Sequence, residues 1–268
     1  MTRAFLMTAG LMAGAVGPAA AQHDFRGLDA GRPLQVSDAY PVEFLEFEWQ
    51  MGVTGNMTED DGQTVAVLGL EFGFARNWEL SVDLEGSWIR TNGSSSTGVE
   101  GMSAHVLFNP NQEGRTTPAL ALQAGITTPG FGDTGRTAAA AEIAAMATRT
   151  FGSFRLHLNG GYEWISMDDG ADEWFAALGT DRALGLSGRL VAADVVVEAP
   201  IGEDTRVLAE VGMRFQTSRT LVFDVGLGSR LDEWTDGRPH IAVTVGLSRG
   251  FGIAAFMGGL TYPDPRIN

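Results

Sequence analysis

The segment Asn77-Trp-Glu-Leu-Ser-Val-Asp-Leu-Glu-Gly-Ser-Trp88 decides the fold class of this chain. Apolar residues alternate with polar ones along it. Because successive side chains of a strand point to opposite faces, one face of this strand is apolar and the other is polar and acidic. A strand of about ten residues with this alternation, and a tryptophan near each end, is typical of membrane-spanning β-barrels.

The same alternation recurs along the chain and predicts about twelve strands. They are expected near residues 42–53, 64–74, 77–88, 102–108, 120–126, 138–151, 154–164, 173–180, 191–198, 207–215, 221–227 and 241–251. The alanine-rich stretch 138–151 would be helical on propensity alone, but its place between two strands favours a strand. An even strand number is usual in single-chain bacterial barrels. We therefore predict an all-β fold, a transmembrane antiparallel up-and-down β-barrel.

Connection lengths and aromatic residues support closure in a membrane. The connections 75–77, 152–153 and 217–219 are short, whereas 55–62 and 91–98 form longer polar loops and 109–117 is an exception to this alternation. Aromatic rings settle at the two membrane–water interfaces, so we expect two girdles. The short-turn end holds Phe74, Trp78, Phe108, Phe151, Phe154, Phe215 and Phe251, and the other end holds Trp49, Trp88, Trp164 and Trp174. A soluble β-barrel has no reason for two girdles.

The domain organisation follows from the two ends of the chain. Residues 1–21 carry one positive charge, a short apolar run and small residues before Gln22, which indicates a secretory signal peptide. The apolar run is short for a transmembrane anchor. We expect a periplasmic lead segment at 22–41, the outer-membrane barrel at 42–251 and a C-terminal extension of unassigned structure at 252–268.

Composition excludes several classes of function. The chain has no cysteine, so disulfides, thiolate metal sites and cysteine nucleophiles are excluded. A net charge of −15 argues against a nucleic-acid partner, because binding phosphates requires a basic surface. The acidic loops at 59–61, 168–172, 232–233 and 236 lack the spacing of a dedicated calcium loop, and a solvated rim facing lipopolysaccharide is favoured over a cation site. We expect no metal and no cofactor.

The polar faces of the strands predict an acidic lumen. The residues expected to line it are Glu46, Glu48, Glu71, Glu79, Asp83, Glu85, Arg155, His157, Glu163, Asp194, Glu198, Glu210, Arg214 and Asp224. Charged rings in a pore select by sign, so an open lumen of this kind favours cations and neutral polar solutes over anions. The alternative is a barrel whose acids pair with its few arginines, or whose inward loops plug it, so that it conducts nothing.

An enzymatic site is the least supported alternative. Ser103 and His105 share one face of a strand, but their spacing does not present a poised nucleophile and base, and no acid partner is identifiable. His157 beside Arg155 is expected to be a hydrogen-bonded residue of the lumen. An outer-membrane lipid-modifying enzyme therefore stands behind the channel and behind a structural or adhesive barrel.

Several segments resemble the outer-membrane family of the meta-pathway of phenol degradation. The resemblance begins at Arg32-Pro-Leu34 and Ser37-Asp-Ala39, continues through Leu70 to Leu80, and recurs at Ala124 to Gly130. It implies a monomeric outer-membrane barrel with a role in the uptake of hydrophobic or aromatic compounds. Such barrels usually end on an aromatic residue, whereas here Phe251 is followed by seventeen further positions, 252–268.

The combined prediction is a passive channel or transporter for small solutes in the outer membrane of a Gram-negative bacterium. Its expected partners are outer-membrane lipid and lipopolysaccharide, the barrel-assembly machinery and a small-molecule solute, and the chain is expected to be a monomer without nucleic acid. Aromatic or hydrophobic solutes are the class that the resemblance implies.

Overall fold

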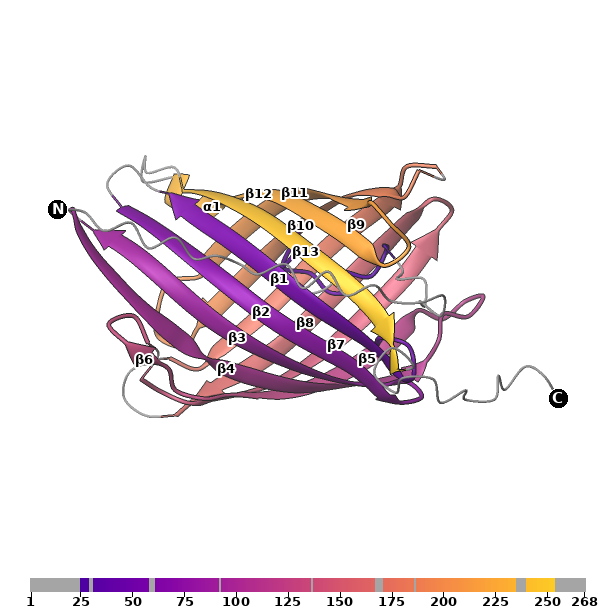
Figure 1. Cartoon of the computed structure of the whole chain (residues 1–268), viewed down its shortest axis with the longest axis horizontal. Coiled ribbons are helices and arrows are strands. Elements are labelled where there is room, and N and C mark those ends of the chain that lie inside the picture. Colours follow the sequence, from indigo (N-terminus) through magenta and orange to yellow (C-terminus); the bar gives the residue numbers. More distant parts are fainter. Residues whose placement is uncertain are drawn as a thin grey trace.

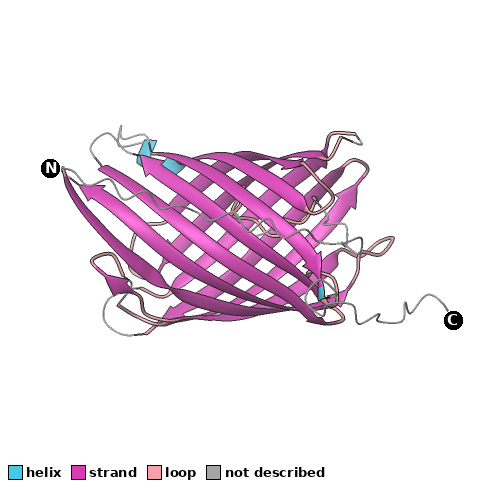
Figure 2. Ribbon diagram, in the orientation of Figure 1, coloured by secondary structure: helices cyan, strands magenta, loops and turns pink. Residues whose placement is uncertain are grey.

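The structure is a computed structural model that describes residues 25–28, 31–57, 61–91, 93–135, 137–166, 171–185, 187–234 and 240–253. Figures 1 and 2 show a barrel of tilted antiparallel strands. The expected signal peptide and nearly all of the expected C-terminal extension lie outside the described residues.

Twelve long strands form the wall. They are β1 (Glu46–Met57), β2 (Asp61–Ala75), β3 (Trp78–Thr91), β4 (Ser94–Asn111), β5 (Ala119–Thr127), β7 (Ala140–Phe151), β8 (Phe154–Ile165), β9 (Glu173–Ala183), β10 (Arg189–Pro200), β11 (Arg206–Gln216), β12 (Leu221–Arg230) and β13 (Ile241–Gly252). The short strand β6 (Phe131–Gly132) pairs with β4, and the helix α1 (Leu231–Trp234) follows β12. Across the described ranges, the structure contains no helix with the length and apolar character needed to cross a membrane.

The sheet closes on itself in sequence order. Each wall strand pairs with the wall strands before and after it, and β1 pairs with β13 from Glu46–Gly252 to Met57–Ile241. Figure 1 shows this seam as β1 in indigo beside β13 in yellow. The predicted up-and-down barrel of twelve strands is therefore confirmed, and the alanine-rich segment is the strand β7.

The two faces of the wall differ as the alternation predicted. Outward side chains are large and apolar, and Leu68, Leu122 and Leu178 are 54%, 57% and 53% exposed. Inward side chains are mostly polar, and several of them, such as Thr148 and His157, are fully buried. An apolar outer wall requires hydrocarbon around it, because in water these side chains would turn inward.

Strands β2, β3 and β4 are longer than the alternation predicted, and β1 is shifted by four residues along the chain. Only residues 92–93 separate β3 from β4, so the expected loop at 91–98 is wrong, and β1 and β2 extend into the expected loop at 55–62. The reason is that strand ends beyond the hydrocarbon carry polar residues on both faces, as Ser94-Ser-Ser-Thr97 does. Without an apolar face, the period of two disappears although the strand continues.

The largest difference concerns the lead segment. We define the inner segment as residues 31–45, which precede β1. It lies against the inner wall, where Leu34 and Val36 are buried, rather than in the periplasm as the sequence had led us to expect. Figure 1 shows this indigo stretch within the barrel.

Candidate functional site: the lumen and its inner segment

All fourteen residues expected to line the lumen lie on the inner face of the wall. The inward position follows from strand alternation around the most buried members, which are Glu48, Glu71, His157, Asp194, Glu210, Arg214 and Asp224. Glu46, Glu79, Asp83, Glu85, Arg155, Glu163 and Glu198 are half-buried on the same face. Their role along a path for solute remains a prediction.

The inner segment begins in a notch made by glycines. A Cβ at Gly52 would collide with the Arg32 side chain, and a Cβ at Gly212 or Gly226 would collide with Pro33. Glycine at these inward positions allows the segment's backbone to approach the wall closely. The Arg32 guanidinium donates to Gln50 and to the Leu247 carbonyl, at 3.3 Å for the latter.

Two carboxylates hold the middle of the inner segment. The backbone N–H of Gln35 donates to both Asp194 Oδ2 and Glu210 Oε2, each at 2.9 Å, and the N–H of Val36 donates to Asp194 Oδ2 at 2.8 Å. An irregular segment has no ladder partners for its N–H groups, so buried side chains must accept them. These two predicted residues therefore bind backbone.

The segment continues around the wall to β3. Ser37 N–H donates to Asn159 and Ala39 N–H donates to Thr148, at 2.7 and 3.0 Å. Asn109 on β4 donates to the Ala39 carbonyl at 2.7 Å. The N–H of Val42 then donates to Glu79 on β3, also at 2.7 Å. Contacts from β13 round to β3 make the segment an inner belt that narrows the lumen.

Ion pairs fill much of the remaining inner surface. Arg214 Nε and Asp224 Oδ1 are 2.6 Å apart and both side chains are fully buried. Arg155 bridges Asp181 on β9 and Asp38 of the inner segment, at 2.7 and 3.2 Å. His157 lies between Asp181 Oδ2 and Thr148 Oγ1, at 2.7 and 3.0 Å. The bases that we expected in the lumen thus neutralise part of its acidity.

Apolar patches on the inner wall were missed by sequence reasoning. Leu28, Leu34 and Val36 pack against inward Leu190, Ala192 and Val196 of β10 and against Ala177 of β9. A second patch joins Ala39 with Leu107, Ala119, Ala121, Ala144 and Met146. Their signal in the sequence is a large apolar residue at an inward strand position. Such a residue would contact water in an open lumen, so it indicates that another part of the chain covers it.

Open space remains on both sides of the barrel axis. One cavity of about 170 Å³ is lined by Glu85, Glu100, Ser103, His105, Glu142 and Glu163 among others. Another of about 230 Å³ lies between the inner segment's Gln35 and the β10–β13 wall, lined by Glu198, Arg206, Arg230 and His240. Charged side chains line both cavities, and the second also has apolar walls at Val207 and Leu208.

Ser103 and His105 lie in the first cavity but do not form a catalytic pair. Residues two apart on a strand are separated by about 6.8 Å, beyond the reach of a hydrogen bond between a serine and its base. The His105 ring packs closely over Gly125 of β5. The arrangement places a histidine and several carboxylates around the cavity, with Ser103 too far along the strand to be activated by His105.

The residues of the predicted aromatic girdle lie on the outer face of the barrel, and one of them, Trp49, lies at a different end from the one predicted. Trp78 stacks on Phe108 at 4.4 Å between ring centroids. At the seam, Phe47 stacks on Phe72 and on Phe251. Phe74, Trp88, Phe154 and Trp164 are exposed, and Trp49, Phe215 and Phe251 are half-buried. Trp49 lies at the short-turn end, not at the opposite end as expected, because β1 begins at Glu46 rather than near residue 42.

The acidic loops are only partly described. Asp172 accepts hydrogen bonds from the Ile165 N–H and the Tyr162 hydroxyl, and these bonds lower the pKa of its carboxyl. Asp232 accepts from the Val207 N–H and from Arg230. Residues 59–60, 168–170 and 236 lie outside the described part of the chain. Within that part, no three His, Asp or Glu residues are grouped to hold a metal ion.

The fold matches solved outer-membrane barrels. An outer-membrane channel from Pseudomonas putida F1 superposes with a TM-score of 0.66 at 12% identity, over 84% of this chain and 100% of that one. The KdgM porin, solved with disordered oligogalacturonate, gives 0.53 at 10% identity, over 75% and 98%. The translocator domain of the autotransporter NalP from Neisseria meningitidis gives 0.50 at 12% identity, over 78% and 88%. At these identities the likeness establishes the fold.

Sequence relationship assigns the family. No protein among the curated sequences matches the chain. The family profile described as "Putative MetA-pathway of phenol degradation" matches residues 46–245, which is the barrel from β1 into β13. The barrel fold and the apolar outer wall place the chain in the cell outer membrane. Because the profile covers most of the sequence, this protein belongs to the outer-membrane β-barrel family described by that name.

Proposed function

We propose that the protein is a passive channel for small solutes whose lumen is narrowed by the inner segment. The observation that carries the proposal is unfilled space lined by charged side chains inside the closed wall, the cavities of about 170 and 230 Å³. A barrel of twelve strands encloses more room than its inward side chains fill. The channel and porin structures with the same fold support this proposal.

The solute class follows from the lining and from the family. Glu85, Glu142 and Glu163 surround one cavity, which favours cations and neutral polar molecules over anions. The name of the family favours small aromatic compounds of the phenol type. A neutral phenol satisfies both, because it has an apolar ring and a hydroxyl that can donate to a carboxylate.

Conductance in planar bilayers tests the proposal. The refolded mature protein should give small cation-selective currents, and a variant in which the inner segment is displaced should give larger ones. A disulfide between the inner segment and the wall can control the displacement reversibly. The chain has no other cysteine, and Val36 of the inner segment packs directly against Gly179 on β9. In Val36→Cys/Gly179→Cys, oxidation should hold the current low.

The single cysteine variants separate the effect of the disulfide from damage to the barrel. The Val36→Cys single variant should conduct like the wild type under oxidising and reducing conditions, whereas Gly179→Cys, whose Cβ would lie 2.4 Å from Val36 Cγ1, should conduct like the reduced double variant under both conditions. Swelling of liposomes loaded with the protein, in phenol and in benzoate, reports solute flux. Absence of both current and flux from the wild type and from the reduced double variant would leave a structural or adhesive barrel as the function.

A further inference from the structure

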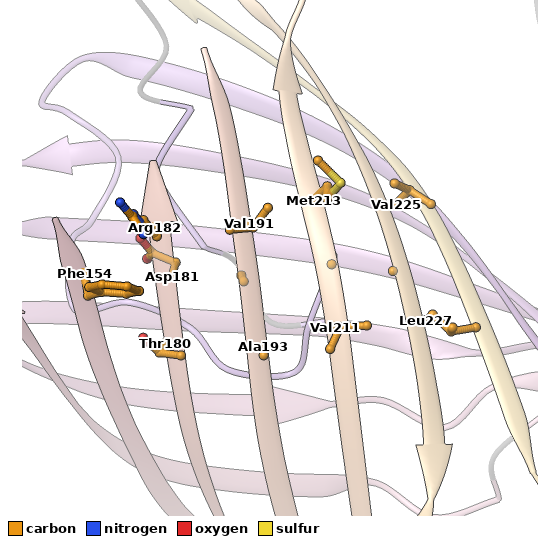
Figure 3. Close-up of a pocket in the computed structure, with 13 residues that line it drawn as sticks. Phe154, Thr180, Asp181, Arg182, Val191, Ala193, Val211, Met213, Val225 and Leu227 are labelled. Carbon is orange, nitrogen blue, oxygen red and sulfur yellow. The ribbon is translucent and has the colours of Figure 1, made fainter. Parts of the chain in front are cut away.

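The outer face of β8–β12 carries a groove of about 520 Å³ (Figure 3). One register row along it runs Phe154, Arg182, Val191, Met213, Val225, and the next runs Thr180, Ala193, Val211, Leu227. Thr180 and Ala193 are small at its centre, whereas Leu178 and Val195, two residues further along the same strands, are large and exposed. The recess comes from this step in side-chain size.

The groove begins at a membrane interface. Arg182 is one residue from the end of β9, and Arg189 is the first residue of β10. Both lie at the short-turn end with Phe154 and Phe215 of the girdle. The groove therefore starts at the level of the lipid headgroups and extends toward Val211 and Leu227 in the hydrocarbon.

The charge at this end of the groove is positive. The outward residues of β8–β12 include no acid, and their charged members are Arg182 and Arg189, in a chain whose net charge is −15. The Arg182 guanidinium lies over the Phe154 ring, 4.9 Å from its centroid, which orients it at the interface. Figure 3 shows Arg182 and Phe154 on neighbouring strands.

The two arginines can reach one anion. Arg182 is directly opposite Val191, so Arg189 is its diagonal neighbour across the β9–β10 pair. Diagonal neighbours on one face are about 7–8 Å apart, a span that a phosphate between two long side chains bridges. Guanidinium groups bind phosphate through parallel charge-assisted hydrogen bonds.

We propose that this groove is a binding site for one glycerophospholipid. An acyl chain lies along Ala193, Val211 and Leu227, and the phosphate lies between Arg182 and Arg189. The paired positive charges select a phosphate headgroup over the sugar headgroup of a neutral detergent. The site lies on the outer wall and is independent of any passage through the lumen.

Native mass spectrometry tests the charged end of the site. The protein, held in a maltoside detergent, is titrated with phosphatidylglycerol, and the lipid-bound fraction is measured. Arg182→Gln/Arg189→Gln should bind about tenfold more weakly, as the loss of two surface charge contacts implies. Arg249→Gln, which removes an outward arginine on β13 away from the groove, should bind like the wild type. Equal binding by all three proteins would overturn the proposal.

A second pair of variants tests the apolar end. Ala193→Phe fills the groove and should abolish binding, whereas Ala145→Phe on the outer face of β7 should not. Heat-modifiable migration on gels verifies that each variant is folded. Glycerol phosphate, which has no acyl chains, should not bind. If it binds as tightly as the lipid, or if Ala193→Phe instead removes a dimer that carries no lipid, the groove is not a phospholipid site.

Discussion

At the residue scale, alternation predicted which way each side chain faces but not what it contacts. The period of two fixes the face of Asp194, Glu210 and Arg214 because a strand has no other choice. Their partners are backbone groups of an irregular segment far away in sequence, and no period encodes such contacts. The fourteen inward residues were therefore correctly oriented, while the view of them as a water-exposed acidic lining was incomplete.

The buried Arg214–Asp224 pair gives a prediction about stability. Arg214→Met leaves Asp224 in a closed environment, with Arg32 Nη1 3.9 Å from its Oδ2. Breaking a buried ion pair costs roughly 3–5 kcal/mol, whereas replacing both members by apolar residues is often neutral. Urea unfolding in detergent should show this loss for Arg214→Met and near-recovery for Arg214→Met/Asp224→Leu. A double variant no more stable than the single one would contradict the assignment.

At the element scale, the inner segment is the feature that the sequence analysis did not place. It has no periodicity, so pattern reasoning treats it as a loop outside the barrel. Two signals point the other way. First, the apolar side chains of Leu107, Met146 and Leu190 point inward and must be shielded from water. Second, the inward glycines at 212 and 226 leave room for another segment of backbone against the wall. Neither signal states which segment provides the cover.

Displacing the inner segment by one glycine substitution should open the lumen. A Cβ at Gly226 would lie 2.3 Å from the Pro33 carbonyl oxygen, so Gly226→Leu cannot accommodate the segment in its present position. We expect a severalfold larger single-channel current than in the wild type. Gly55→Ala, at an outward position with nothing nearby, serves as the control. Unchanged current in folded Gly226→Leu would show that the segment does not limit flow.

The turn between β4 and β5 gives a prediction about pH. Burial raises the pKa of Glu113, but hydrogen bonds from the Thr150 N–H and hydroxyl, at 2.9 and 2.7 Å, and the charge of Arg149 outweigh it, so the pKa lies below its ordinary value of 4.5. A lowered pKa means that ionised Glu113 stabilises the fold above pH 4.5 and that this stability is lost as pH falls through the folded pKa.

Glu113→Gln isolates this contribution. The variant should unfold at a lower temperature than the wild type at pH 7, and the difference should shrink at an acid pH below the folded pKa, where the wild-type carboxyl is also neutral. Thermal unfolding in detergent, followed by circular dichroism, measures both. A difference that is the same at the two pH values would place its origin in packing rather than in charge.

At the scale of the whole molecule, strand number and closure could be predicted, while strand length could not. Twelve alternating segments and an apolar outer face leave no stable arrangement in water, and a closed barrel is the sheet that satisfies every backbone group in hydrocarbon. The extensions of β3 and β4 beyond the membrane lack an apolar face, so nothing in their composition distinguishes them from loops. The ends of β1 were misplaced in the same way. The strand is Glu46–Met57 rather than 42–53, and this shift puts Trp49 at the short-turn end of the barrel instead of the opposite end.

Site-directed spin labelling along β3 tests the central claim that lipid contacts one face of each strand and water the other. Single cysteines from Leu80 to Glu85, in an otherwise cysteine-free chain, can be labelled in liposomes and probed with oxygen and with a water-soluble nickel complex. Labels at 80, 82 and 84 should collide mainly with oxygen, and those at 81, 83 and 85 should be shielded from it. Collision rates with no period of two, or with the opposite phase, would contradict the account.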